Sequence, residues 1–179
     1  LLAEVAAGGR PVRDLDQART ADLRPAELAA ALADLAAAVD GEALAALRAS
    51  AEHLGLLARA RADLHSRRWS RRLPAARLLT ALAAIAPDDV TALLRDRHPA
   101  IRAQATTWAA LTPTPAVLDE IAALLRDPDG HCRFAAKDAM VRAGAAATPA
   151  LTALLRSDDP ATVTAALQVA AVTGEPALA

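Results

Sequence analysis

Four histidines and one cysteine are the side chains of this sequence that could most readily hold a metal ion or act as a nucleophile. The histidines are His53, His65, His98 and His131, and no two of them are three or four residues apart. No helix would therefore present two of them on one face as zinc ligands. Because Cys132 is the only cysteine, we expect neither an intrachain disulfide nor a cysteine-based zinc site. We expect no metal, no cofactor and no catalytic residues in this chain.

Cys132 could serve as a nucleophile, since His131 precedes it in the sequence. Adjacent side chains diverge on a helix, however, so His131 is poorly placed to act as a base for the thiol. Cys132 also occupies the position that Ile101 holds in an earlier copy of the repeat described below. We therefore predict that Cys132 packs in the hydrophobic core.

Residues 127–130 read Asp-Pro-Asp-Gly, which is similar to the opening of a calcium-binding loop. Such a loop needs the pattern Asp-x-Asp-x-Asp-Gly and a glutamate at its twelfth position, where this chain has Asp138. The composition of the segment instead predicts a tight turn.

The most basic stretch of the chain is 59–77, RARADLHSRRWSRRLPAAR, which holds seven arginines and one acidic residue, Asp63. Four of these arginines surround Trp69 with the spacing of a single basic helical face, and they are the candidate binding residues of the sequence. They are Arg67, Arg68, Arg71 and Arg72. Such a face could bind the phosphates of nucleic acid or of anionic lipid, or the acidic surface of a protein partner.

The alternative for this stretch is that its arginines pair with acids of neighbouring helices, such as Glu52, Asp88 and Asp89, while Trp69 packs in the core. The whole chain has a net charge of -1 and an isoelectric point of 6.5. Nucleic-acid-binding domains usually have isoelectric points above about 9, so nucleic acid is the less favoured partner.

The composition predicts that helices position these side chains. Of the 179 residues 54% are hydrophobic and only 2% aromatic, and alanine and leucine dominate the apolar set. Both residues favour helices, whereas the residues that favour strands are scarce. The chain is long enough to bury a sizeable core. We therefore expect an all-α fold.

The sequence also bears on location. No uncharged apolar run reaches the ~18 residues of a membrane-spanning helix, and the opening LLAEVAAGG has no basic leader of a signal peptide. A single cysteine fits a reducing compartment, so we expect the cytoplasm. The chain begins at Leu1 rather than methionine, which favours a piece of a longer protein. A segment outside this chain could then tether it to a membrane.

A tetrapeptide, Leu-Leu-Arg-Asp, occurs at 93–96 and 124–127, and returns as Leu-Leu-Arg-Ser at 154–157. The spacings are 31 and 30 residues, and a fixed period of this size indicates a repeat architecture. Each copy is expected to hold two amphipathic helices, which bury their apolar faces only by stacking on neighbouring copies. The Leu-Leu pairs would form the inward side of each second helix.

In the clearest copy Pro99 opens a first helix, with Ile101, Ala105 and Trp108 on one face, and the prolines of 112–115 end it. We predict four copies, at 66–96, 97–127, 128–157 and 158–179. Residues 24–65 would form an N-terminal helical cap, and residues 1–23 a linker or a loosely attached helix.

These copies resemble the short form of the HEAT repeat, also found in bilin-lyase-type proteins. In that family the second helix ends Leu-Leu-x-Asp-Pro, and a hydrophobic residue, an arginine and small residues follow. Residues 124–136 match this pattern and residues 93–103 match most of it, whereas Ser157 and residues 162–164 lack the Asp and the Arg. A terminal capping repeat often departs in this way.

The resemblance has structural and functional implications. It implies a right-handed α-α superhelix in which neighbouring loops are joined by a ladder of hydrogen bonds, through Asp96, Arg102, Asp127 and Arg133. It implies a non-enzymatic scaffold that binds another protein. The chain is also similar to the soluble part of bacterial HEAT proteins that carry a membrane anchor.

Two other functions remain open. One is a nucleic-acid-binding module that uses residues 59–77, by likeness to HEAT-like DNA glycosylases. The other is a lyase-like enzyme, as in bilin-attachment proteins, which would need a deep cavity with an acid beside it. The sequence indicates neither the partner nor the oligomeric state.

Overall fold

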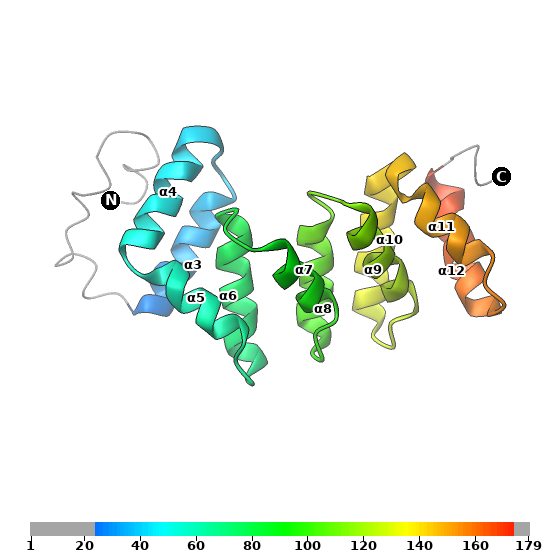
Figure 1. Cartoon of the computed structure of the whole chain (residues 1–179), viewed down its shortest axis with the longest axis horizontal. Coiled ribbons are helices and arrows are strands. Elements are labelled where there is room, and N and C mark those ends of the chain that lie inside the picture. The colour runs from blue at the N-terminus through cyan, green and yellow to red at the C-terminus, as the bar shows by residue number, and fades with distance from the viewer. Residues whose placement is uncertain (1–23, 174–179) are drawn as a thin grey trace. The chain divides into compact units, whose positions relative to one another are not determined.

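The computed structural model describes residues 24–173, and within that range every regular element is a helix (Figure 1). This confirms the all-α prediction. The predicted linker or loose helix at 1–23 lies outside the described residues. No helix within 24–173 is both long and apolar enough to cross a membrane. The chain divides into two compact units at Ala86–Pro87, and each is described by itself.

The first unit contains four helices: α3 (Pro25–Ala36), α4 (Gly41–His53), α5 (Leu56–Leu64) and α6 (Trp69–Ala81). Helix α6 packs against α3 and α5, and α4 packs against the same two helices. Gly41 and Gly55 lie at the starts of α4 and α5 with φ of +52° and +68°, a backbone conformation in which glycine carries no steric cost. Residues 24–65, expected to be helical, therefore contain three helices.

The unit boundary falls inside the predicted copy 66–96. Helix α6 belongs to the compact unit of α3–α5, whereas the next helix begins the second unit. The repeat boundaries proposed from the sequence therefore stay a prediction.

The second unit contains α7 (Pro87–Leu94), α8 (Pro99–Ala109), α9 (Pro115–Ala123), α10 (Gly130–Ala143), α11 (Thr148–Leu155) and α12 (Pro160–Thr173). A short 3₁₀ helix, Leu124–Arg126, follows α9, and another, Gly144–Ala147, precedes α11. Helices α7, α8, α9 and α12 each begin with proline, which suits the first helical position because the N–H there has no intrahelical partner.

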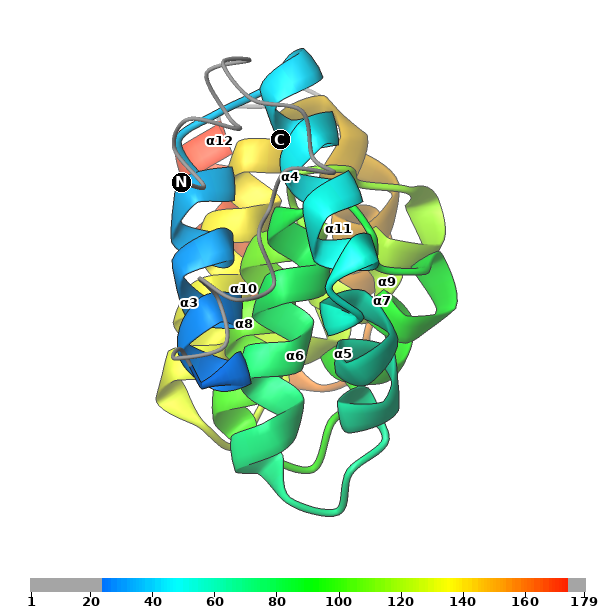
Figure 2. The ribbon, with the colours of Figure 1, turned by 90° about the vertical axis from the view of Figure 1, so that its left-hand side faces the viewer.

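These six helices form three pairs, α7 with α8, α9 with α10, and α11 with α12. Helices α8, α10 and α12 lie in one row, and α7, α9 and α11 in a second row beside it (Figures 1 and 2). Each pair covers the apolar side of the next. This is the arrangement of an all-α solenoid, as predicted.

The Leu-Leu pairs lie where the repeat pattern places them. Leu93, Leu94, Leu124 and Leu125 are buried. Burying a leucine contributes about 1.5–3 kcal/mol, so each pair is a substantial part of the contact between neighbouring copies. The third pair, at 154–155, is only half-buried, because no later helix pair covers α11 among the described residues.

The first-helix row packs through small residues. Ile101, Ala105, Cys132 and Ala136 are fully buried between α8 and α10. The position of Cys132 in the core is thus confirmed. Trp108, expected on the same buried face, is only half-buried.

Candidate functional site

Four turns of the chain each contain the same type of hydrogen bond. In each, a side-chain oxygen accepts the backbone N–H two residues later, at 3.2, 2.7, 2.9 and 3.2 Å in chain order. The accepting residues are Ser66, Asp96, Asp127 and Ser157. Their spacings are 30, 31 and 30, so the turn repeats with the period of the Leu-Leu pairs. Serine and aspartate can both make this bond, so the turn at Ser66 is equivalent to the other three although no Leu-Leu pair precedes it.

After three of these turns, an arginine six residues beyond the accepting residue donates a hydrogen bond back to the turn. The Nη1 groups of Arg72, Arg102 and Arg133 each donate to the carbonyl oxygen six residues earlier, at 2.8, 2.7 and 2.8 Å. A guanidinium can bind its own turn in this way and still offer its other N–H groups to a neighbour. The fourth copy has Val163 at this position.

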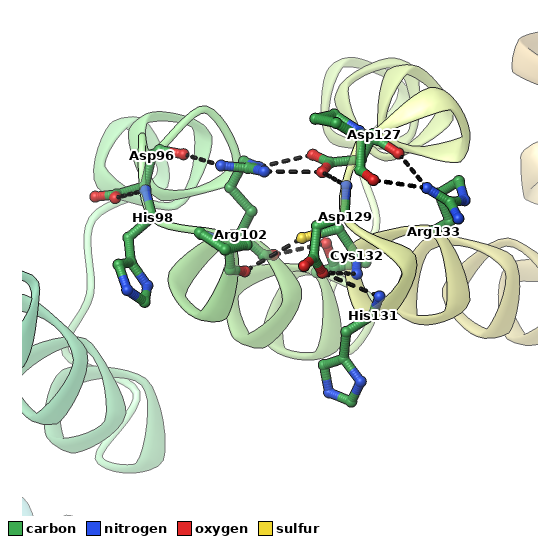
Figure 3. Close-up of polar contacts among 11 residues, drawn as sticks. Asp96, His98, Arg102, Asp127, Asp129, His131, Cys132 and Arg133 are labelled. Atoms are coloured by element: carbon green, nitrogen blue, oxygen red, sulfur yellow. Dashed lines mark hydrogen bonds and ion pairs between the residues drawn. The ribbon is translucent and has the colours of Figure 1, made fainter.

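Arg102 joins two successive turns (Figure 3). Its Nε and Nη2 groups donate to the two carboxylate oxygens of Asp127 at 2.7 and 2.8 Å. The side chains of Arg102 and Asp127 are only 14% and 4% exposed. The hydrogen bonds from Arg102 lower the pKa of Asp127, so the carboxylate stays charged although it is buried. This confirms the predicted contact between neighbouring loops for Arg102 and Asp127. Arg102 reaches Asp96 only through its backbone oxygen, and Arg133 likewise donates only to backbone oxygens of its own turn.

The four candidate binding arginines do not form one exposed face. Arg72 is buried, with 6% of its surface exposed, and its Nη1 donates to the carbonyl oxygens of Ser66 and Arg67. Arg72 binds its own turn as Arg102 and Arg133 bind theirs, and it is not a surface residue. Arg67 and Arg68 precede α6 and, like Arg71 within it, are exposed.

Trp69 is 45% exposed, which corrects the expectation that it packs in the core. Of the acids proposed as partners of the basic stretch, Glu52 pairs with Arg61 at 3.5 Å. No ion pair or hydrogen bond engages the side chain of Arg68 or of Arg71 within residues 24–173. The exposed part of the basic stretch is therefore smaller than the sequence indicated.

A groove of about 260 Å³ runs along α3, α5 and α6 in the first unit. Its walls are mostly Ala, Leu and Pro, with Arg59, Asp63 and Arg71 among the lining residues. Asp63 lies 3.9 Å from Arg59 in an ion pair, so the acid of this groove is already engaged. The lyase-like alternative stays a prediction.

The histidines and Cys132 form no metal site among the described residues. The Sγ atom of Cys132 lies 3.2 Å from the carbonyl oxygen of Pro99, and burial raises the pKa of the thiol to about 11. A thiol that stays protonated and buried is a poor nucleophile. His131 is exposed in the first turn of α10, and Asp129 caps that helix by accepting the N–H groups of His131 and Cys132. Residues 127–130 are thus a turn, as predicted.

A second groove, of about 550 Å³, lies between α10 and α12 and is called the α10–α12 groove below. Its lining residues are Leu125, Arg126, Asp127, Pro128, Arg133, Lys137, Ala161, Thr164, Ala165 and Gln168. Sequence reasoning missed this groove, because its cations come from the 3₁₀ helix Leu124–Arg126 and from α10 and form no run in the chain.

The comparisons with known proteins agree with this repeat geometry. Residues 87–171 match the family model of HEAT repeats, and these residues lie in the second compact unit. Comparison with curated proteins and with solved structures found no match. The matched segment covers the three helix pairs, their Leu-Leu pairs and the Arg102–Asp127 contact. By both sequence and architecture, residues 87–171 belong to the HEAT repeat family.

Proposed function

We propose that this chain is a non-enzymatic scaffold that binds another protein through its HEAT repeats. HEAT repeats generally serve as protein-interaction scaffolds, because a stack of helix pairs presents one long surface built from equivalent positions. This role suits a location in the cytoplasm, whether the chain is free there or tethered by a segment outside it.

The observation that carries the proposal is the surface of α10 and α12. Phe134 is 69% exposed on α10, and Leu167 is 51% exposed on the neighbouring helix α12. Phe134 is the single phenylalanine of the chain. Exposure of a large apolar side chain to water is unfavourable, and a partner that covers it gains binding free energy. Binding of a partner over α10 and α12 would remove both side chains from water.

The test begins with affinity capture using the chain as bait, followed by a binding measurement with each purified protein that it retains. Phe134→Glu and Leu167→Glu should each lower the affinity for a true partner by at least about tenfold, because a charge would then be buried in the contact. Leu111→Glu is the matched control, since Leu111 is equally exposed but lies after α8. Equal affinities for all three variants would refute a binding surface on α10 and α12.

Nucleic acid is a second candidate partner, favoured by one observation. Trp69 is exposed between Arg68 and Arg71, and an aromatic ring flanked by cations is a common way to bind a single strand. If this surface binds DNA, the double variant Arg68→Gln/Arg71→Gln should lose binding, and the affinity should fall steeply with salt. Absence of any DNA complex at low salt would eliminate this candidate.

A further inference from the structure

Arg133 makes only part of the contacts that Arg102 makes one repeat earlier. Its Nη1 donates to the carbonyl oxygens of Asp127 and Pro128, at 2.8 and 2.9 Å. Its Nε and Nη2 groups donate to no acceptor within residues 24–173. Figure 3 shows the Arg133 guanidinium reaching the Asp127 turn from the side opposite to Arg102. The edge of Arg133 that carries two parallel N–H groups is therefore open.

The reason is a substitution in the next repeat. On Arg102, the same edge binds the Asp127 carboxylate through both nitrogens, at 2.7 and 2.8 Å. The residue equivalent to Asp127 one repeat later is Ser157, whose Oγ accepts the N–H of Asp159 at 3.2 Å. Serine can make the turn, but it is short and carries no charge, so it cannot replace the carboxylate. One carboxylate is thus missing from an otherwise repeated contact.

Arg133 lines the α10–α12 groove, and the charges of that groove favour an anion. Of the described residues that line it, the cations are Arg126, Arg133 and Lys137. Arg126 is paired with Asp159 at 3.0 Å, and the Asp127 carboxylate is held by Arg102. The Nζ of Lys137 donates to the neutral amide oxygen of Gln168, which leaves its charge uncompensated. Two like charges near one groove raise the local concentration of anions.

We propose that the α10–α12 groove binds a carboxylate of a partner protein, from aspartate or glutamate, through Nε and Nη2 of Arg133. The partner's carboxylate takes the place that an aspartate at position 157 would fill, and Lys137 adds a second positive charge. This proposal rests on the scaffold function and specifies the chemistry of the partner's contact. A carboxylate is favoured over a phosphate, because the equivalent edge of Arg102 binds a carboxylate through both nitrogens.

Nuclear magnetic resonance of the arginine side-chain Nε–H groups tests the site directly. A blocked hexaglutamate peptide should shift the Arg133 resonance saturably at millimolar concentration and leave that of Arg102 in place. A blocked hexaglutamine peptide should shift neither, and inorganic phosphate should act more weakly than hexaglutamate. Absence of a saturable shift at Arg133, or a stronger response to phosphate, would overturn the proposal.

The matched variants are Ser157→Asp and Ser157→Asn. Both keep an oxygen for the turn, but only aspartate supplies the missing charge. Ser157→Asp should abolish the peptide-induced shift and lower the unfolding equilibrium constant about tenfold relative to Ser157→Asn, and Arg133→Gln should remove that difference. If the shift survives in Ser157→Asp, the peptide binds elsewhere. Loss of this site would leave the scaffold proposal standing, since that depends on Phe134 and Leu167 with a natural partner.

Discussion

The Arg102 guanidinium binds the Asp127 carboxylate through two hydrogen bonds, Nε to Oδ2 at 2.7 Å and Nη2 to Oδ1 at 2.8 Å. The two residues are 25 positions apart in the sequence, and their contact joins two successive turns. Since Arg102 also donates to the backbone oxygen of Asp96, one side chain fixes the spacing of two turns. This contact therefore holds one helix pair in a fixed position against the next.

Removing one partner of this contact should destabilise the second unit strongly. Asp127→Asn keeps an oxygen for the turn but leaves the half-buried Arg102 without its counter-charge. We expect a loss of about 3 kcal/mol in the free energy of unfolding, measured by urea denaturation. The control is Asp138→Asn, which breaks the exposed pair between Arg142 and Asp138 and should cost less than about 0.5 kcal/mol. Similar losses in both variants would contradict a special role for the buried pair.

The same contact makes stability depend on pH in a defined direction. Hydrogen bonds from Arg102 hold the pKa of Asp127 below its ordinary value of 3.8 in the folded chain. A carboxyl group whose pKa is lower when folded contributes stability that is complete well above pH 3.8 and is lost as the pH falls through the folded pKa. Urea unfolding of Asp127→Asn, from about pH 6 to about pH 2, should therefore show a shallower acid loss than the unsubstituted chain. Parallel curves would refute this assignment.

The two Leu-Leu pairs at 124–125 and 154–155 should differ in their contribution to stability. Leu125 is buried between helix pairs, so Leu125→Ala should cost about 3 kcal/mol through lost burial and an unfilled cavity. Leu155 is half-buried, and Leu155→Ala should cost about 1 kcal/mol. Thermal and urea unfolding of the two variants measure the difference directly. An equal cost would show that Leu155 is covered as fully as Leu125.

Cys132 should resist alkylation in the folded protein. It is fully buried, and burial raises the pKa of its thiol to about 11, so little thiolate forms at neutral pH. Labelling by iodoacetamide should be at least about a hundredfold slower than in urea, because the thiol reacts only when the surrounding structure opens. The double variant Cys132→Ser/Ala100→Cys places the thiol at an exposed position of α8 and should react rapidly. Rapid labelling of folded Cys132 would contradict its place in the core.

The sequence by itself determined the helices, the period and most of the core. Prolines open four of the helices of the second unit, and two of the three Leu-Leu pairs are buried as predicted. These features are local: a proline lacks the N–H that the first helical position does not need, and a 3.6-residue period places apolar residues on one face. The helices of residues 87–173 could therefore be derived from residue order alone, whereas their grouping into repeat copies stays a prediction.

Only the tertiary structure decided the role of each arginine. Arg71 and Arg72 are neighbours in the sequence, yet Arg71 is exposed and Arg72 is buried on the carbonyl oxygens of its own turn. Arg102 and Arg133 have equivalent positions, but Asp127 binds Arg102, whereas no carboxylate of residues 24–173 binds Arg133. The physical reason is that a long, flexible guanidinium takes its contacts from acceptors that another turn supplies, and those acceptors are set by packing between repeats. Residue type and spacing gave the charge of each arginine, and packing gave its partner.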